Sequence, residues 1–285
     1  MISATTLQCI EDSILPAASN NIPELFNEID IADFGELLLM IPDQYPRMKQ
    51  FFPAMPSNEI QTQWTGSFGN ILLAQSCIFV RSMVEKYQKH SRRALAESKV
   101  LDYGIGWGRI SRLMYKFVPV GNLYGVDAWQ ESINICNECK LLEKTALVDE
   151  YPKSLPFSVK FDLIYAFSLF THLSQKCGQS ILKVLRQNIS KDGLLFVTIR
   201  PKEYWDRHLE FSNNRCDVGV MKSSHESLGF AYAPHNRPNI DGDVPYGDAS
   251  MSLEFIKLNW VEWGVVESYL DEGDIFQTIV VLKPV

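Results

Sequence analysis

The residues most directly suited to chemistry in this sequence are an acid and three glycines that follow it at alternate positions. Asp102 ends a short apolar segment, and Gly104, Gly106 and Gly108 come next. Glycine accepts positive φ angles and lets a ligand approach the backbone without a Cβ in the way. Apolar residues at helical spacing follow from Ile110, so a helix with unpaired N–H groups should begin directly after the glycines. The pattern predicts a strand, a ligand-binding turn and a helix.

The acid in this turn separates two classes of nucleotide ligand. Nicotinamide and flavin nucleotides favour G-x-G-x-x-G, whereas here the third glycine comes one residue early and Asp102 would repel a pyrophosphate. A carboxylate suits a cofactor that carries an ammonium and a sulfonium charge. The segment D-Y-G-I-G-W-G-R resembles the first motif of class I S-adenosylmethionine-dependent methyltransferases. That resemblance implies that Asp102, Tyr103 and the loop from Gly104 to Gly108 hold the methionine end of S-adenosylmethionine.

A second acid follows the next predicted strand, at 122–126. The two carboxylate oxygens of Asp127 can accept hydrogen bonds from both ribose hydroxyls of an adenosine; the alternative is a helix cap, and one residue can do both. By the same resemblance, Ala128 and Trp129 lie beside the adenine or ribose. A weaker third strand is predicted at 145–148, and Asp149 after it is predicted to reach the adenine amine. The alternative for Asp149 is a solvated loop carboxylate.

The segment F-D-L-I-Y-A-F-S-L-F-T-H-L-S begins with a buried fourth strand at 161–167. It resembles the fourth motif of the same superfamily, and most of all uncharacterised bacterial methyltransferases associated with modification of surface glycans or small acceptors. Open α/β sheets bind ligands at the carboxyl ends of their strands. Phe167 and Ser168 are therefore predicted neighbours of the cofactor.

Histidines near this strand are candidates for proton transfer. A hydroxyl acceptor loses its proton as it attacks the methyl group, and a neutral imidazole suits that role. His172 is the first candidate, since phosphoethanolamine methyltransferases carry a similar D-A-I-L-H-L-S segment with a catalytic histidine. The alternative for His172 is a residue that caps or packs the following helix. His235 and His225 are further candidates, with surface or structural roles as their alternative, and a phosphate or carboxylate acceptor would need no base.

Two segments are predicted to meet the acceptor. Residues 201–250 are rich in proline and glycine and predict a long irregular insertion at the edge where the cofactor binds. Its candidate contacts are aromatic, basic and acidic, and a surface loop is the alternative: Tyr232, His235, Arg237, Tyr246 and Asp248. Trp64 precedes a helix predicted over 67–88 and is predicted to fold over the active site as part of a lid. The alternative is a buried tryptophan that anchors that helix.

Alternating strands and helices predict the fold class: α/β, a Rossmann-like doubly wound seven-stranded sheet with an antiparallel terminal strand. The fifth strand is predicted at 194–199 after a turn at 191–193, and a hairpin at 264–270 and 275–282 supplies the last two strands. Residues 1–90 are predicted as an N-terminal helical extension or cap, with short helices over 23–40 and a proline-punctuated loop from 42 to 56. The first 60 residues could cover the substrate or bind a partner, and the alternative is a helical layer packed on the domain. Residues 91–285 form the methyltransferase domain, with the acceptor-covering insertion at 201–250.

Composition limits the partners. The 285 residues are 46% hydrophobic and carry a net charge of −7, so they present no basic surface for nucleic acid or anionic membrane. No apolar run reaches the roughly 18 residues of a membrane span, and no signal peptide is evident. Six scattered cysteines favour reduced thiols and a cytoplasmic protein. Cys136 and Cys139 have the spacing of half a zinc site but no second pair, so no metal is predicted.

Three functions compete. The first is a methyltransferase that uses S-adenosylmethionine to O-methylate a small-molecule or glycan acceptor. The second is a catalytically silent relative that serves as a binding subunit, against which the complete set of acids and glycines counts. The third is a nicotinamide-dependent oxidoreductase, against which Asp102, the glycine spacing and the terminal hairpin count. The sequence leaves the acceptor and the oligomeric state open.

Overall fold

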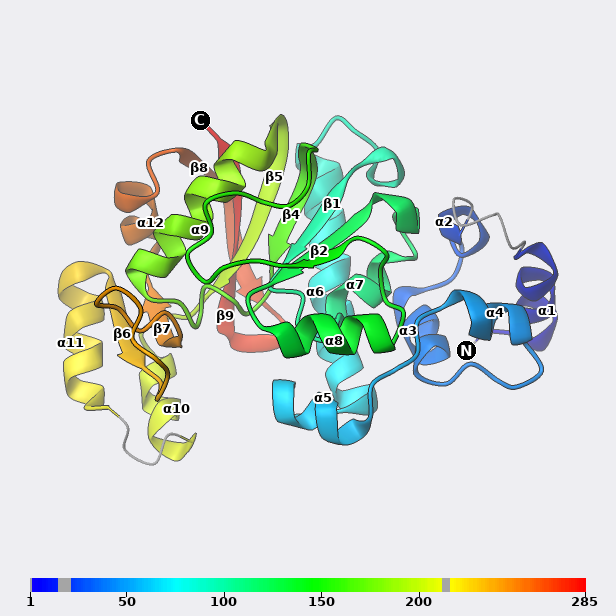
Figure 1. The fold of residues 1–285 in the computed structure, drawn as a ribbon, viewed down its shortest axis with the longest axis horizontal. Helices are drawn as coiled ribbons and strands as arrows, with labels where there is room; N and C mark the ends of the chain where they lie inside the picture. The colour runs from blue at the N-terminus through cyan, green and yellow to red at the C-terminus, as the bar shows by residue number, and fades with distance from the viewer. Residues whose placement is uncertain (1, 15–21, 212–215) are drawn as a thin grey trace. The chain divides into compact units, whose positions relative to one another are not determined.

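The computed structural model describes residues 2–14, 22–211 and 216–285. Seven strands form one mixed sheet (Figure 1), as the sequence predicts. The chain divides into two compact units, Met1–Leu147 and Val148–Val285.

Among the described residues, six α-helices precede the first strand: α1 (Ala4–Ser13), α2 (Ile22–Leu25), α3 (Ile31–Leu39), α4 (Pro46–Phe51), α5 (Asn58–Thr65) and α6 (Gly69–His90). The loop predicted from 42 to 56 is wrong in part, because it contains α4. Pro46 suits the first turn of that helix. The buried carboxylate of Glu11 accepts hydrogen bonds from the backbone N–H groups of Arg47 and Met48 at 2.7 and 2.9 Å. The residue that caps α4 therefore belongs to α1 and lies 36 positions before Arg47 in the sequence.

The first unit contributes three parallel strands in the order β3-β2-β1: β1 (Val100–Tyr103), β2 (Leu123–Asp127) and β3 (Thr145–Leu147). The weak third strand is confirmed. Short 3₁₀ turns, η1 (Leu95–Glu97) and η2 (Val120–Asn122), lead into β1 and β2. Helix α7 (Arg109–Met114) follows the glycine turn, and α8 (Gln130–Glu138) follows β2. Helix α8 ends at Glu138, and Lys140 shortly after it takes a positive φ of 52°.

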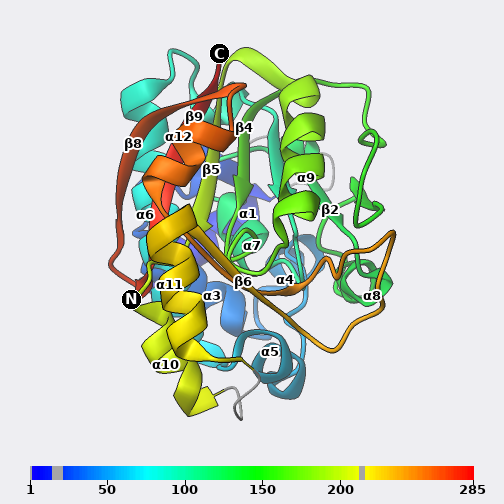
Figure 2. The same ribbon diagram turned by 90° about the vertical axis from the view of Figure 1, so that its left-hand side faces the viewer.

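The second unit contributes the strands β4 (Phe161–Ala166), β5 (Ile189–Ile199), β9 (Asp274–Pro284) and β8 (Trp263–Asp271), in that order. Strand β5 runs parallel to β4, whereas β9 is antiparallel to both β5 and β8; the terminal hairpin is confirmed. Helices α9 (Gln175–Asn188) and α12 (Leu253–Asn259) lie over one face of these strands (Figure 2).

The turn predicted at 191–193 is wrong, since these residues belong to β5. Phe161 pairs with Ile189, but Leu163 pairs with Leu194. More residues of β5 than of β4 therefore lie between the two pairs, and the register shifts there. Lys191 and Asp192 are exposed within this irregularity.

The insertion at 201–250 is not irregular, which corrects the prediction; residues 212–215 lie outside the described residues. It holds α10 (Tyr204–Phe211), α11 (Val218–Leu228), β6 (Phe230–Pro234) and β7 (Gly247–Met251), grouped together in Figure 1. Trp205 is fully buried against Ala231 and Ala233, and its indole N–H donates to Ser250 Oγ at 2.7 Å. A small core of its own orders this segment.

None of the described helices alone has the length and apolar character of a membrane span, although the bent pair of α5 and α6 taken together passes that test of length and composition. Eight side chains of α6 are buried in the protein core. All six cysteines are free thiols. Within the described residues, no three His, Cys, Asp or Glu side chains gather in a way that could hold a metal ion.

Candidate functional site

The three glycines of the turn take left-handed φ angles of 81° at Gly104, 55° at Gly106 and 82° at Gly108. A Cβ on Gly108 would lie 1.9 Å from Leu141 Cδ2, whereas a Cβ on Gly106 would have nothing within 4 Å. Packing therefore requires glycine at Gly108. At Gly106 the backbone faces open space, as the approach of a ligand requires.

Asp127 connects this turn to the start of α8. Its Oδ2 accepts the backbone N–H of Gly106 at 2.8 Å, and its Oδ1 accepts that of Trp129 at 2.9 Å. Burial raises the pKa of the Asp127 carboxyl, and these amide hydrogen bonds oppose the rise. Each carboxylate oxygen has more than one acceptor position. Asp127 can therefore hold the turn and still accept from ribose hydroxyls.

Asp102 and Tyr103 are the last two residues of β1, directly before the turn, and each is 3% exposed. The hydroxyl of Ser111 donates to Asp102 Oδ2 at 2.7 Å, so the acid ties β1 to the first turn of α7. The sequence analysis missed Arg112, a residue that is 2% exposed and whose guanidinium donates to the carbonyls of Trp107 and Ala54, both at 2.6 Å. A cation among the apolar residues of α7 was the available signal. This arginine fixes the backbone of the glycine turn.

Trp64 packs beside the same turn. Its ring lies 5.4 Å from that of Trp129, at an interplanar angle of 60°, and it covers a buried cluster that includes Leu72 and Trp107. Trp64 and Trp129 are half-buried, as is Ala128. The contact brings Trp64, the predicted lid residue, against Trp129, which is predicted to lie beside the adenine or ribose.

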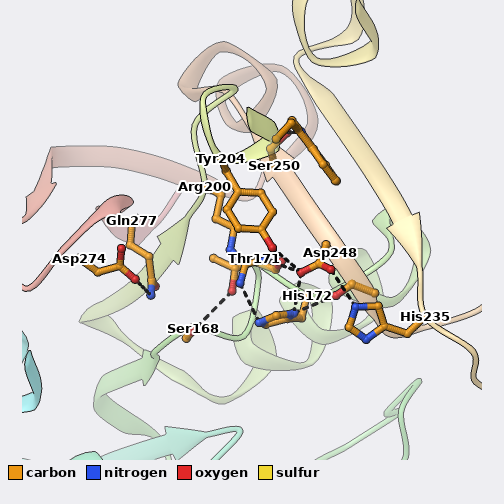
Figure 3. Close-up of polar contacts among 12 residues, drawn as sticks. Ser168, Thr171, His172, Arg200, Tyr204, His235, Asp248, Ser250, Asp274 and Gln277 are labelled. Carbon is orange, nitrogen blue, oxygen red and sulfur yellow. Dashed lines mark hydrogen bonds and ion pairs between the residues drawn. The ribbon is translucent and has the colours of Figure 1, made fainter. Parts of the chain in front are cut away.

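In the second unit, polar groups converge on Asp248 (Figure 3). We call Asp248 and the four side chains that surround it, His172, Arg200, Tyr204 and His235, the Asp248 cluster. The Asp248 carboxylate accepts hydrogen bonds from Arg200 Nη1 at 2.7 Å, Tyr204 Oη at 2.8 Å and His235 Nε2 at 2.8 Å. Burial raises the pKa of Asp248, but the His235 hydrogen bond and the Arg200 charge outweigh it and hold the pKa well below its usual range. The carboxylate is therefore ionised at neutral pH.

His172 has both ring nitrogens engaged. Nδ1 lies 2.8 Å from the carbonyl oxygen of Gly247, and Nε2 lies 3.0 Å from Arg200 Nη2. Burial, followed by the Arg200 charge, lowers the pKa of His172 to about 3. The ring also stacks on Tyr246, with 5.0 Å between centroids and 9° between planes. A role as base remains a prediction, and it would require the contact with Arg200 to open.

Backbone hydrogen bonds attach the insertion to the segment after β4. The N–H of Gly247 donates to His172 O at 2.8 Å, and that of Ala249 donates to Thr171 O at 2.9 Å. Ser168 takes a φ of 54°, and its N–H donates to Thr198 Oγ1 at 2.7 Å. These bonds place residues that follow β4, residues at the end of β5 and strand β7 side by side.

Of the other predicted site residues, some lie beside the Asp248 cluster and others lie away from it. Arg237 lies over the Tyr246 ring at 5.7 Å and belongs beside the Asp248 cluster. Tyr232 Oη donates to the carbonyl of Val244 at 2.6 Å, which tethers the loop. Asp149 is exposed and Phe167 is buried, and their contacts with a cofactor remain predictions. His225 bonds to Ser250 and lies outside the cluster.

The sequence analysis also missed Arg200 and Tyr204. Arg200 follows the last residue of β5, and a charged residue directly after a buried strand was a signal of the same kind as Asp127. Tyr204 begins α10, a helix that the sequence analysis did not predict.

Comparisons with known proteins agree with this geometry. Residues 100–193 match the family described as a methyltransferase domain. A solved S-adenosylmethionine-dependent methyltransferase from Clostridium acetobutylicum ATCC 824 is similar with a TM-score of 0.50 and 14% identity, over 73% of this chain and 91% of that chain. The magnesium protoporphyrin IX methyltransferase from Synechocystis PCC 6803, with bound SAH, has a TM-score of 0.50 and 12% identity, over 88% of this chain and 97% of that chain. A comparison with curated proteins gives no match.

The sheet, the glycine turn and the family match together define the class. Residues 100–193 carry a methyltransferase domain, and the chain has the fold of solved S-adenosylmethionine-dependent methyltransferases. The domain match indicates a methyltransferase, and the similar enzyme from Synechocystis holds SAH, the product that S-adenosylmethionine leaves after methyl transfer. The predicted enzyme class and cofactor are confirmed, and the nicotinamide-dependent alternative is set aside.

Proposed function

We propose that this enzyme transfers the methyl group of S-adenosylmethionine to a hydroxyl of a small-molecule or glycan acceptor. The observation that carries the proposal is the imidazole of His235 hydrogen-bonded to the ionised Asp248, in the segment predicted to cover the acceptor. A hydroxyl is a weak nucleophile until its proton leaves, so O-methylation gains from a positioned base. An acceptor that is already an anion would need no such pair.

In this proposal the first unit holds the cofactor, which supplies an activated methyl group when bound. Gly106 offers open backbone, Asp127 offers carboxylate oxygens to the ribose, and Trp129 offers an aromatic face beside the adenine. Asp102 contributes negative charge for the methionine ammonium. The positive φ angles favour glycine at these positions, and glycines keep side chains away from the turn. A ligand can therefore approach the backbone there.

The acceptor side of the proposal rests on the second unit. Tyr246 is a half-buried ring beside His172, and Arg237 is an exposed cation over that ring. An aromatic face with neighbouring hydrogen-bond donors suits a polyhydroxylated acceptor such as a sugar. Six free thiols support the further proposal of a reducing, cytoplasmic location.

Two measurements test the function in sequence. Calorimetric titration should give micromolar affinity for S-adenosylmethionine, about −8 kcal/mol, and none for NADH. Transfer of tritium from [methyl-³H]S-adenosylmethionine to a panel of nucleotide sugars and glycans should then give a labelled ether, which resists mild base whereas a methyl ester does not. Cofactor binding without labelling of any acceptor would favour the silent binding subunit. A labelled amine or ester would overturn O-methylation.

A further inference from the structure

Two imidazoles lie in the Asp248 cluster, with 6.4 Å between the ring centroids of His172 and His235. Both were candidates for the base. Their hydrogen bonds differ in a way that decides where each ring carries its proton. Only a ring nitrogen with an available lone pair can take a proton from an acceptor.

The lone pair of His172 is already used. The Gly247 carbonyl can only accept, so Nδ1 of His172 must carry the hydrogen in their 2.8 Å contact. Nε2 then has the lone pair, and it accepts from the guanidinium of Arg200 at 3.0 Å. His172 is a neutral ring locked in the Nδ1–H tautomer.

His235 has the opposite arrangement. Its Nε2 lies 2.8 Å from Asp248 Oδ2, and because an ionised carboxylate only accepts, Nε2 must carry the hydrogen. Among the described residues the His235 ring makes its hydrogen bond through Nε2, which leaves the lone pair on Nδ1. The side chain is 26% exposed, so a ligand can reach it. Figure 3 shows His235 with one ring nitrogen toward Asp248.

We propose that His235 is the catalytic base and that Asp248 orients it, while His172 is a positioning residue that acts through Arg200. The inference rests on the proposed function. As the acceptor oxygen attacks, an O–CH₃ bond forms and the bond from the methyl carbon to sulfur breaks. The bond's electron pair goes to sulfur, leaving neutral S-adenosylhomocysteine, and the hydroxyl proton moves to Nδ1 of His235. The imidazolium then lies against the Asp248 carboxylate, as in carboxylate–histidine pairs of other enzymes.

Arg200 and Tyr204 complete the arrangement. Both donate to Asp248 Oδ1 and leave Oδ2 to His235. Arg200 also donates to the carbonyl of Thr171 and to His172 Nε2, and its guanidinium lies 4.0 Å from the centroid of the Tyr204 ring. The carboxylate is therefore held at both oxygens, and Oδ2 is the one that contacts the base.

The first experiment needs no acceptor. Long-range ¹H–¹⁵N correlation spectra of the full-length protein at pH 7.5 should show His172 as the Nδ1–H tautomer and His235 as the Nε2–H tautomer, with signals assigned from His172→Asn and His235→Asn. Asp248→Asn should abolish the preference at His235. A proton on Nδ1 of His235 in the wild type would overturn the inference, whether or not any methyl acceptor is known.

The second experiment uses the acceptor identified by tritium transfer. His235→Ala should lower kcat about 100-fold or more and leave the Kd for S-adenosylmethionine unchanged, and added imidazole should restore part of kcat. His172→Asn should lower kcat less and should not respond to imidazole. His225→Asn, outside the cluster, is the matched control. A fully active His235→Ala would overturn the base assignment while O-methylation stands, whereas failure of every acceptor would overturn the proposed function while the tautomers stand.

Discussion

The indole rings of Trp64 and Trp129 lie 5.4 Å apart, and the backbone N–H of Trp129 donates to Asp127. Helix α5, which ends one residue after Trp64, is therefore joined through two contacts to the carboxylate proposed to bind ribose. Gly66 ends α5 with a left-handed φ of 75°. The helical extension is thus packed onto the proposed cofactor site by an aromatic pair.

Trp64→Ala should weaken binding of S-adenosylmethionine about 5- to 10-fold, because an aromatic pair contributes about 1 kcal/mol beyond its buried area. Trp64→Phe should retain most of the affinity. Calorimetry measures both, and Ile71→Ala, at a 78% exposed position on α6, is the control. Unchanged affinity in a folded Trp64→Ala protein would leave Trp64 with only its anchoring role.

Asp127→Asn should weaken S-adenosylmethionine binding by about 1–3 kcal/mol, the scale of charge-assisted hydrogen bonds. The amide can still accept one backbone N–H, so the fold should survive. Glu131→Gln removes an exposed acid from the first turn of α8, the helix that follows Asp127. This control variant should bind S-adenosylmethionine normally. If the two variants titrate alike, Asp127 serves the turn alone.

Alanine at two glycines of the turn should affect stability and cofactor binding to different extents. Gly108→Ala places a Cβ against Leu141 and should lower the free energy of unfolding by about 2–4 kcal/mol. Gly106→Ala has open space and should cost about 1–2 kcal/mol for its positive φ, yet it should abolish cofactor binding. Urea unfolding and calorimetry separate the two effects. Normal binding by Gly106→Ala would exclude that backbone from the cofactor site.

Lowering the pH should reduce the free energy of unfolding, because His172 is held neutral in the folded protein. Its pKa falls from an ordinary 6.5 to about 3 in the folded state, so the unfolded chain binds the extra proton between these values and stability declines as pH falls. The loss attributable to His172 at pH 5 is about 2 kcal/mol. Asp248 acts in the same direction only below its ordinary pKa of 3.8.

Urea unfolding at pH 7 and pH 5 tests this contribution. Burial also lowers the pKa of His225, so the informative quantity is the difference in slope between wild type and His172→Asn. The variant should lose less stability between the two pH values. Equal losses would mean that His172 can take up a proton in the folded state.

The strands and the terminal hairpin were predictable because their signals are local. Buried apolar runs mark β1, β2 and β4, acids lie at the ends of β1 and β2, and even the faint β3 was found. Helix α4 was not, because its cap comes from Glu11. The helices of the insertion were missed because prolines and glycines were given more weight than the cap at Asp217 and the end at Gly229, both visible in the sequence.

The candidate residues were easier to predict than their roles. Asp248 and His235 were both named as acceptor contacts, but their pairing depends on the register of β6 with β7, in which Ala233 lies opposite Asp248. The environment of His172 depends on Arg200, which is 28 positions away. Residue types suggest a base, whereas only tertiary packing determines which imidazole has a lone pair to offer.

The hairpin of the insertion separates two properties that evolution can change independently. Asp248 lies on β7 and His235 directly follows β6, whereas Arg237 lies on the exposed connection between the strands. That connection is held at its base by Tyr232 and by the contact of Tyr151 with Asp243 at 2.6 Å. If the proposed function holds, a lineage, or an engineer, can therefore exchange the tip of this connection to retarget the enzyme to another acceptor while the proposed pair of Asp248 and His235 is inherited intact.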